Sequence, residues 1–523
     1  MLIIDLLLQH NRNRPDSTSI VDGDCSITYS ELLTRVYETS KALIAKGIAP
    51  GDRIATIAPP CAEYWIIFLA TTTIGAEWLG LNPRYQRREY RFFLEDAGPK
   101  MIFTFSPYDG RDYTKELEVI LAGADMLEYP EVVAFSGTNL NKSLCLNKSE
   151  NEDEFIANQR LESRIQAVEE HDTAAIVYTS GSTGKPKGTM LSHYALLKCA
   201  EANVKWLGDS LEKVISPYPI NHVGNLNNIC MNVLTFGGTI YFLKTFSTAD
   251  IIELYKSSGI THAGHNQTTF QMLLDSPDFS LETVSSIKTL VHGGSKTSMA
   301  TLEVFQKTNI DIASVYAQTE SCGYVLRSDL NASLETMANT IGKPIDGVEA
   351  RIFDNEKGTI ANEGDFGELQ LKFDWCFSGY LNNPEATDAA FTLDGFLRTG
   401  DLCVRRPDGN YELIERIKNV FKSGGYDVYP IEIEQILHEH PKVRLAVIIE
   451  ANHQKFGSCG YAFVQPVSGV DLRENELISY LSKEIADYKI PKYIDIVDEL
   501  PLLPSKKIDR QTLKNLANMV PRQ

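Results

Sequence analysis

Cysteine is scarce in this chain, and the cysteines present follow no recognisable pattern. Nine occur among 523 residues, with no Cys-x-x-Cys pair and no cluster with histidine. The sequence therefore predicts neither a disulfide framework nor a zinc site. Positive charge is also in deficit, because the net charge is −19, which argues against nucleic acid or an anionic membrane as the main partner. Any polyanionic ligand must be met by local lysines and arginines.

Long apolar runs and targeting signals are missing as well. No stretch reaches the ~18 apolar residues of a membrane-spanning helix. The apolar run at the N-terminus is interrupted by Asp5, no basic segment precedes it and no small-residue cleavage site follows. We interpret it as an amphipathic helix that ends near Pro15. The last residues, Val520–Gln523, carry no peroxisomal tripeptide, so the expected location is the cytoplasm.

The length of 523 residues predicts more than one domain, because single hydrophobic cores stop growing near ~250–300 residues. Apolar strand-like runs alternate with helix-like segments over the first part of the chain. This alternation favours an α/β fold with layered parallel sheets. The strand-like runs are Arg53–Ala58, Met101–Phe105, Val132–Phe135, Ala174–Tyr178, Thr239–Phe242 and Thr289–His292.

Three further segments differ from this alternation. Ser143–Glu170 is polar, and we interpret it as a surface connection. Gly367–Lys372 alternates with period two, which predicts a smaller β-rich unit. Near the end, Pro430 begins a helix whose first turn is acidic, and Val443–Glu450 is typical of a strand. The last hundred or so residues are therefore expected to form a separate α+β unit.

The most informative segment is Tyr178–Gly188, YTSGSTGKPKG, which follows a predicted buried strand. Its ten positions after the tyrosine hold three glycines, four hydroxyl residues and two lysines. Glycines let backbone N–H groups turn toward one anion, hydroxyls add donors, and lysine adds a mobile charge. The pattern indicates a phosphate-binding loop, although it matches neither GxxxxGK[ST] nor a GxGxxG that opens a helix.

This loop matches the signature of the adenylate-forming, AMP-dependent enzymes, a superfamily of acyl- and aryl-CoA synthetases, luciferase-like enzymes and peptide-synthetase adenylation domains. Other motifs of that superfamily occur in its usual order, from Ile27–Leu32 to Lys507, so the resemblance covers nearly the whole chain. It implies a large N-terminal domain, residues 1–417, of layered α/β sheets with a β-rich subdomain. A small, mobile α+β domain, residues 418–523, is expected to follow.

The resemblance implies an ATP site built from several separated motifs. The phosphate loop contacts the β- and γ-phosphates, and Val291–Ser295 contacts adenine. Tyr316–Glu320 matches YGxTE, with Ala317 in place of glycine. In Phe396–Asp401 the final carboxylate accepts hydrogen bonds from the ribose. The implied ATP ligands are Thr179, Ser180, Gly181, Ser182, Thr183, Gly184, Lys187, Gly293, Gly294, Ser295, Tyr316, Ala317, Thr319, Asp401, Arg416 and Lys507.

Catalysis and metal binding are implied at four of these motif positions. Thr319 donates to the α-phosphate, and Glu320 with Thr183 holds Mg²⁺ through hard oxygen ligands. Lys507, in the closing motif Leu500–Arg510, offsets charge between the carboxylate and the α-phosphate. Lys506 stands where glycine is usual and Leu503 where threonine is usual, so the two adjacent lysines leave the assignment open by one residue.

The resemblance also assigns residues to the hinge and to CoA. Glu415–Lys418 corresponds to the motif [GD]RxK, in which Lys418 marks the hinge between the domains. The segment that follows it swings in for the second half-reaction and lines the pantetheine tunnel. Glycines there let a narrow acyl acceptor pass close to the backbone. The implied CoA ligands are Lys422, Ser423, Gly424 and Gly425.

The pocket for the acid is the least specific part of the sequence. Pro217–Gly224 resembles the PLFHxxG segment of acyl- and aryl-CoA synthetases and lacks the FDxS form of amino-acid-activating domains, which disfavours an amino-acid substrate. His222 is the catalytic candidate there. Polar residues elsewhere either bind an oxygen-bearing group of the acid or are ordinary loop residues. The acid-pocket candidates are His222, His265, Asn266 and Gly323, with Gln267, Asn225, Asn227 and Asn228 nearby in sequence.

The expected activity is ATP-dependent ligation of a carboxylic acid to CoA through an acyl-adenylate, with ATP, Mg²⁺ and CoA as cofactor or co-substrates. One alternative is a ligase that loads a carrier protein instead of free CoA. A second is a non-catalytic ATP-binding relative, against which Glu320, Asp401, Arg416 and Lys507 together argue. A luciferase-like oxygenase is a more distant third.

Overall fold

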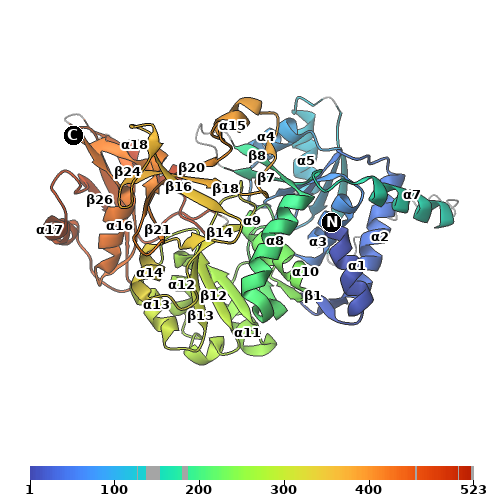
Figure 1. Cartoon of the computed structure of the whole chain (residues 1–523), viewed down its shortest axis with the longest axis horizontal. Helices are drawn as coiled ribbons and strands as arrows, with labels where there is room; N and C mark the ends of the chain where they lie inside the picture. Colours follow the sequence, from blue (N-terminus) through green and yellow to red (C-terminus); the bar gives the residue numbers. More distant parts are fainter. Residues whose placement is uncertain are drawn as a thin grey trace.

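The computed structural model describes residues 1–126, 128–136, 154–179, 186–423, 425–453, 456–503 and 506–519. The chain forms a large body of two parallel-rich sheets and one antiparallel sheet, and a small C-terminal sheet with its helices lies at one end (Figure 1). The expected fold class, an α/β large domain with a β-rich subdomain and a small α+β domain, is confirmed.

The first large sheet has nine strands in the order β15-β14-β13-β12-β11-β9-β10-β1-β2. Six neighbouring strands, from β13 to β1, run parallel, and helices connect most of them. Its strands are β1 Thr18–Asp22, β2 Cys25–Thr28, β9 Lys213–Ser216, β10 Thr239–Phe242, β11 His262–His265, β12 Thr289–Gly293, β13 Asp311–Ala317, β14 Tyr324–Arg327 and β15 Lys343–Pro344. The helices that follow in this part are α8 His193–Leu207, α9 Val223–Asn225, the π-helix η3 Leu226–Met231, α10 Asn232–Phe236, α11 Thr248–Ser258, α12 Gln267–Leu274, α13 Met299–Gln306 and α14 Leu334–Asn339.

The second large sheet has seven strands in the order β19-β8-β7-β4-β3-β5-β6. These are β3 Arg53–Ile57, β4 Glu77–Leu81, β5 Met101–Phe105, β6 Glu131–Phe135, β7 Thr173–Thr179, β8 Lys187–Ser192 and β19 Gly379–Tyr380. Among its helices are α1 Ile3–Asn13, α2 Tyr29–Ala45, α3 Ala62–Thr73, α4 Arg87–Ala97 and α5 Tyr113–Ala122.

The core of the large domain lies between these two sheets. Every residue of α3 is buried, and this helix contacts strands of both sheets. A helix that is apolar on all sides is stable only when it is surrounded by protein. Its sequence, with Trp65 and Phe68 stacked at 4.9 Å, therefore fixes how the two sheets pack and where their strand ends meet.

An antiparallel sheet connects the large body to the small domain. Its order is β17-β16-β18-β20-β21, which confirms the β-rich unit expected after Gly364. The strands are β16 Glu349–Asp354, β17 Thr359–Ile360, β18 Phe366–Lys372, β20 Leu397–Arg405 and β21 Tyr411–Arg416, and the helix α15 Pro384–Ala389 lies between β19 and β20.

The small domain is a sheet covered on both faces by apolar clusters. Its strands run in the order β23-β22-β25-β24, and β26 pairs with β25. The elements are β22 Phe421–Ser423, β23 Tyr426–Val428, α16 Pro430–Glu439, β24 Val443–His453, β25 Gly457–Pro466, α17 Glu474–Glu484, β26 Tyr493–Ile496 and α18 Arg510–Met519. Only the short turn Ile417–Asn419 separates β21 from β22, and the domain boundary at residues 417 and 418 stays a prediction.

The polar segment Ser143–Glu170, interpreted as a surface connection, contains a helix that the sequence pattern did not predict. Within Ser143–Glu170, residues 154–167 form a regular helix, α7 Glu154–Ala167, whereas residues 143–153 lie outside the described part of the chain. Leu161 is the buried residue of this helix. A helix that buries so little shows no apolar period, which is why the sequence pattern did not reveal it.

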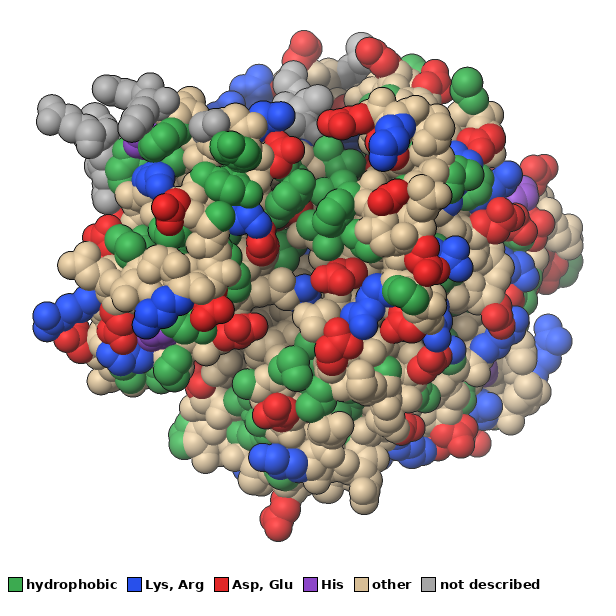
Figure 2. All heavy atoms as spheres, turned by 60° about the vertical axis from the view of Figure 1, so that its left-hand side comes forward, with side chains coloured by type: hydrophobic (Ala, Val, Ile, Leu, Met, Phe, Trp, Pro, Cys, Tyr) green, Lys and Arg blue, Asp and Glu red, His purple; other side chains and the backbone are tan. Residues whose placement is uncertain are grey.

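The surface shows no marked charge segregation on the face drawn in Figure 2, where acidic and basic side chains are interspersed. Among the residues that the structure describes, no helix combines the length and the apolar character needed to cross a bilayer.

Candidate active site

The adenine-loop motif lies where β12 ends beside β13. Gly293 pairs with Val315, and a Cβ at Gly293 would lie 2.4 Å from the carbonyl oxygen of Val315, so no other residue fits there. Gly294 has a φ of +76°, a left-handed conformation that favours glycine. The loop thus opens at the carboxyl end of a parallel sheet, where ligands bind in open α/β folds.

Lys507 reaches this loop from the small domain. A Cβ added to Gly294 would lie 3.1 Å from Cε and 3.4 Å from Nζ of Lys507. Burial lowers the pKa of Lys507, and Arg416 lowers it further, while Asp401 acts in the opposite direction. Lys506, by contrast, directs its Nζ toward Phe246, 4.4 Å from the ring centroid. The structure therefore brings Lys507 to the predicted nucleotide site and leaves Lys506 outside it.

Asp401 stands at the centre of a buried polar cluster. Its side chain is 1% exposed and accepts hydrogen bonds from Tyr316 Oη at 2.5 Å and from Gln318 Nε2 at 3.0 Å. The other carboxylate oxygen forms an ion pair with Arg416 Nε at 2.7 Å. Burial raises the pKa of Asp401, and Arg416 opposes that shift. Three motifs far apart in the sequence thus meet at one carboxylate.

Glu320 is oriented by a tyrosine that sequence analysis missed. Tyr380 Oη donates to Glu320 Oε1 at 2.7 Å, and Lys187 Nζ lies 4.6 Å from the centroid of the Tyr380 ring. Because β19 pairs with β8, this contact links the phosphate-loop strand to the predicted metal ligand. The expected positions Ser180, Gly181, Ser182, Thr183 and Gly184 lie outside the described residues, whereas Thr179 pairs with Lys187 at the loop's base.

The donor set suits Mg²⁺ bound mainly by phosphate. Among the described residues, no group of three or more His, Cys, Asp and Glu side chains could hold a metal alone. Mg²⁺ in nucleotide sites usually takes one or two carboxylates together with phosphate oxygens and waters. Glu320 would supply one such carboxylate. Its charge raises the pKa of Asp401 and of Arg416.

His222 lies close enough to Lys507 for the lysine charge to affect its pKa. Its Nδ1 accepts a hydrogen bond from the Gly224 backbone N–H at 2.9 Å and so caps α9. Burial and the charge of Lys507 lower the pKa of His222 to about 3. The imidazole is therefore neutral at physiological pH, and a hydrogen-bonding role fits it better than that of a charged group.

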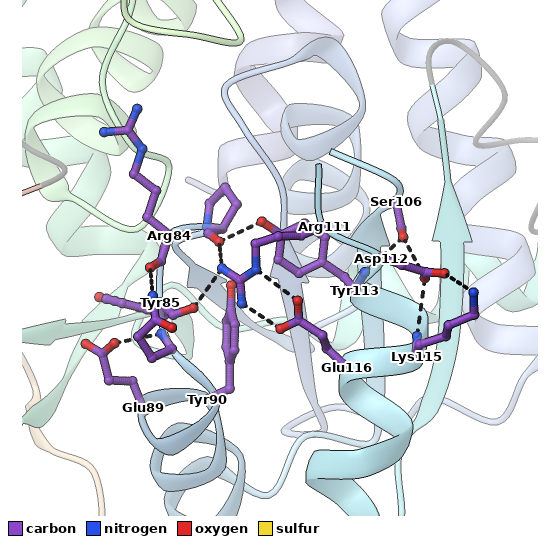
Figure 3. Close-up of polar contacts among 12 residues, drawn as sticks. Arg84, Tyr85, Glu89, Tyr90, Ser106, Arg111, Asp112, Tyr113, Lys115 and Glu116 are labelled. Atoms are coloured by element: carbon purple, nitrogen blue, oxygen red, sulfur yellow. Dashed lines mark hydrogen bonds and ion pairs between the residues drawn. The ribbon is translucent and has the colours of Figure 1, made fainter. Parts of the chain in front are cut away.

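Tyr85, which contacts Asn221, lies in a segment held by hydrogen bonds from Arg111 (Figure 3). Asn221 Nδ2 donates to Tyr85 Oη at 2.8 Å. Arg111 donates to the backbone oxygens of Pro83 at 2.6 Å and Tyr85 at 2.9 Å and pairs with Glu116, and these bonds fix the segment that carries Tyr85. Tyr85 carried no motif signal in the sequence.

Three polar acid-pocket candidates have protein partners. His265 contacts Tyr218 Oη through Nδ1 and Tyr255 Oη through Nε2, both at 2.7 Å. Asn266 Oδ1 accepts from the Thr269 N–H at 2.9 Å and caps α12. Gln267 likewise accepts a hydrogen bond from the backbone N–H of Ser298. These bonds are structural, and contact of His265 or Asn266 with the acid stays a prediction.

A different group of polar side chains lies on the π-helix η3 and at the start of the following helix α10. Asn227 Nδ2 donates to the carbonyl of Cys322 at 2.7 Å, and Asn228 Oδ1 lies 2.4 Å from where a Cβ of Gly323 would be. The buried Oδ1 atoms of Asn227, Asn228 and Asn232 accept no hydrogen bond within the described chain. Buried acceptors are normally satisfied, and π-helical turns occur often at functional sites.

The predicted hinge and CoA residues lie in the turn after β21 and in the hairpin that follows it. Lys418 is in the turn between β21 and β22, where the buried Glu415 accepts from Asn419 Nδ2 and from the Ile431 N–H, both at 2.9 Å. Lys422 is 72% exposed and pairs with Asp427 at 3.6 Å. Ser423 is buried in β22, Gly425 has a φ of +91°, and Gly424 lies outside the described residues.

Known proteins resemble the chain over its whole length. The sequence model of the AMP-binding enzyme family matches residues 7–381, and that of the AMP-binding enzyme C-terminal domain matches residues 432–507. A Mycobacterium tuberculosis CoA ligase, named for a propanoyl group that bears a methyl-dioxo-octahydro-indenyl ring, is 31% identical over 97% of both chains. A feruloyl-CoA synthase from Amycolatopsis is 28% identical over 95% of both chains.

Solved structures agree with these sequence matches. The ATP-bound crystal structure of MatB from Rhodopseudomonas palustris has a TM-score of 0.83, 26% identity and 99% coverage of both chains. The chain therefore belongs to the AMP-binding enzyme family, within the adenylate-forming superfamily.

Proposed function

We propose that the protein is an AMP-forming acid–CoA ligase, which converts a carboxylic acid, ATP and CoA into acyl-CoA, AMP and pyrophosphate. The observation that carries the proposal is the position of Lys507, a cation of the small domain placed against the nucleotide loop of the large domain. The names of the two relatives, both CoA-thioester-forming enzymes, support CoA as the acceptor.

In the first half-reaction, a carboxylate oxygen attacks the α-phosphorus and the bond to the bridging oxygen breaks, so that pyrophosphate leaves. Negative charge builds up between the carboxylate and the α-phosphate, where the ammonium group of Lys507 offsets it. Asp401 accepts hydrogen bonds from the ribose and is held in place by Tyr316 and Arg416. Thr319 donates to the α-phosphate.

Magnesium is held in this proposal by Glu320 and by phosphate oxygens. The hydrogen bond from Tyr380 fixes the orientation of the Glu320 carboxylate. When bound, Mg²⁺ neutralises phosphate charge and makes pyrophosphate a better leaving group.

In the second half-reaction, the CoA sulfur attacks the acyl carbon, the carbon–oxygen bond to AMP breaks, and the thiol proton is released. The position of Lys507 at Gly294 belongs to the first step, so the small domain must turn before the second. Rotation at Lys418 would carry the turn at Gly425 toward the acyl-adenylate, so that one pocket serves both steps.

For the acid, we propose a carboxylic acid without an α-amino group and with an oxygen-bearing substituent. The side-chain oxygens of Asn227, Asn228 and Asn232 are buried without a donor in the described chain, and in this proposal a hydroxyl group of the acid supplies a donor to one of them. The named substrates of the relatives, a feruloyl group and a dioxo ring acid, are oxygenated too.

The test is pyrophosphate release, followed by thioester formation, with matched pairs of acids that differ only in a hydroxyl or keto group. A site that hydrogen-bonds such a group rejects the analogue without it by up to ~10⁴-fold in specificity constant. Preference for plain alkyl or aryl acids would contradict the substrate class. If thioester forms on a phosphopantetheinyl carrier protein but not on free CoA, the carrier protein is the acceptor instead of CoA.

A further inference from the structure

Lys506 occupies a backbone position that lysine disfavours. Its φ is +62°, in the left-handed region where glycine is favoured and an L side chain is strained. The turn is closed by the Leu503 N–H to the Lys507 carbonyl at 2.7 Å and by the Lys506 N–H to the Leu503 carbonyl at 2.8 Å. Glycine would suit this position better, so the lysine side chain must contribute something that glycine cannot.

The side chain of Lys506 crosses from the small domain to the large one. Its Nζ lies 4.4 Å from the centroid of the Phe246 ring, and Phe246 belongs to the loop between β10 and α11. That ring packs near Tyr218, with centroids 6.4 Å apart, and Tyr218 is bonded to His265. The cation therefore contacts an aromatic ring that packs near Tyr218, the partner of His265 in the predicted acid pocket.

The surroundings strengthen this contact. Burial lowers the pKa of Lys506, and the charge of Arg84 lowers it further, which shows that its ammonium group has lost part of its water. A cation over an aromatic face is held most firmly when it is partly desolvated. The Phe246 contact replaces some of the lost hydration.

A second contact supports the same domain orientation. Arg444, on β24 of the small domain, forms an ion pair with Asp275 at the end of α12, with an N–O distance of 2.6 Å. Both contacts join the small domain to the large domain in the arrangement that places Lys507 at Gly294. Contacts made in only one of two arrangements shift the equilibrium toward that arrangement.

We propose that Lys506 is a positioning residue for the first half-reaction, whose contact with Phe246 presses the closing turn against the large domain and so delivers Lys507 to the nucleotide. The contact is released when the small domain turns for thioester formation. This inference rests on the proposed two-step ligase function and adds a residue-level control of its first step.

The decisive variant is Lys506→Gly, because backbone strain and the aromatic contact predict opposite results. Glycine relieves the strained φ yet removes the cation, so we expect adenylation, measured as pyrophosphate release without CoA, to fall about tenfold. Thioester formation from supplied acyl-adenylate should not fall. Lys506→Arg should restore adenylation, because arginine also binds aromatic faces. Adenylation by Lys506→Gly at the wild-type rate, or equal losses in both half-reactions, would overturn the proposal.

Phe246 provides the other half of the test. Phe246→Ala should reproduce the selective loss of adenylation, and the double variant with Lys506→Gly should lose no more than either single change, because both remove one contact. Lys492→Ala is the matched control, since Lys492 lies 5.6 Å from the Phe456 ring within the small domain, and it should change neither half-reaction. Additive losses in the double variant would show that Lys506 acts through another group.

A readout without catalysis separates this proposal from the ligase function. The intact protein is treated with an amine-acetylating reagent and then digested, and acetylation of Lys507 is measured by mass spectrometry of the peptides. Acetylation should be faster in Phe246→Ala than in the wild type, because the turn is held less tightly. If no acid yields pyrophosphate with wild-type enzyme, the ligase function fails while this comparison still stands. Equal acetylation of Lys507 in both proteins would count against the contact whatever the activity.

Discussion

At the scale of single residues, Lys507 and Asp401 hold the site together from opposite domains. The two residues are far apart in the sequence. Lys507 lies against Gly294 of the β12 loop, Asp401 pairs with Arg416, and the charges of Asp401 and Arg416 both act on Lys507. A cation whose pKa is lowered by burial has lost water, so an incoming phosphate gains more from it than from a solvated lysine.

Removing the Lys507 charge should therefore damage one step. Lys507→Ala is expected to reduce acyl-adenylate formation by roughly 10²–10³-fold, the usual cost of one electrostatic stabiliser. Thioester formation from supplied acyl-adenylate should change little. Single-turnover pyrophosphate release and thioester assays check this, with Lys514→Ala, an exposed lysine paired with Glu450, as control. Equal damage to both steps would contradict the assignment.

The sequence motifs predicted which residues would form a nucleotide site, and the structure brings several of them together. Tyr316, Asp401 and Arg416 do converge. Gln318 and Tyr380, which orient Asp401 and Glu320, were missed as individual contacts, since one hydrogen bond leaves no periodic or compositional trace.

At the scale of elements, the β22–β23 hairpin is the segment predicted to serve CoA. Its strands pair from Phe421↔Val428 to Ser423↔Tyr426, and Tyr426 stacks on Tyr488 at 4.7 Å. Open space surrounds Gly425, where a Cβ would meet nothing within 4 Å. A side chain added there therefore projects into the space that an approaching acceptor would use.

Gly425→Leu should accordingly obstruct the thiol and spare adenylation. The expected result is accumulation of acyl-adenylate with a fall in CoA-dependent turnover. Gly469→Leu is the matched control, because Gly469 also has a positive φ and open surroundings in the same domain. Quantifying acyl-adenylate and acyl-CoA by chromatography decides it, and a comparable loss of adenylation in Gly425→Leu would contradict the role.

Elements with strong patterns were predicted well, and those without them were not. Apolar runs such as Met101–Phe105 and Thr239–Phe242 coincide with β5 and β10, because buried parallel strands are apolar throughout. The π-helix η3 went unrecognised, since its two asparagines, Asn227 and Asn228, resemble loop residues and their burial arises only from packing, as in the contact of Asn227 with Cys322.

At the scale of the whole molecule, the two-step proposal depends on rotation at the turn Ile417–Asn419. Lys418→Pro fixes φ and restricts the preceding residue, so the small domain should lose freedom to turn. Acyl-adenylate should then form while CoA-dependent turnover falls. Separate assays of the two half-reactions check this. Lys418→Ala keeps the backbone free and should behave like the wild type in domain movement. Equal slowing of both steps by proline would contradict the hinge.

Buried histidines should make stability depend on pH. Burial lowers the pKa of His193, His262 and His292 to about 4 and of His265 to about 3. Between about pH 4 and 6.5 the unfolded chain binds protons that the folded chain does not, so the free energy of unfolding should rise with pH there. Urea unfolding at pH 5 and pH 7 tests this, and equal stabilities would contradict it. His292→Gln should reduce the difference.

The turn that carries Lys507 against the adenine loop has a consequence for the time course of the reaction. We expect that turn to keep bulk water from the acyl-adenylate of the proposed reaction, and excluding water protects a reactive anhydride from hydrolysis. Enzyme given acid and ATP but no thiol should therefore release one equivalent of pyrophosphate per active site in a rapid burst and then almost stop. The amplitude of that burst would equal the number of active sites competent for adenylation in a preparation. Acid and ATP alone would then suffice to titrate the active sites.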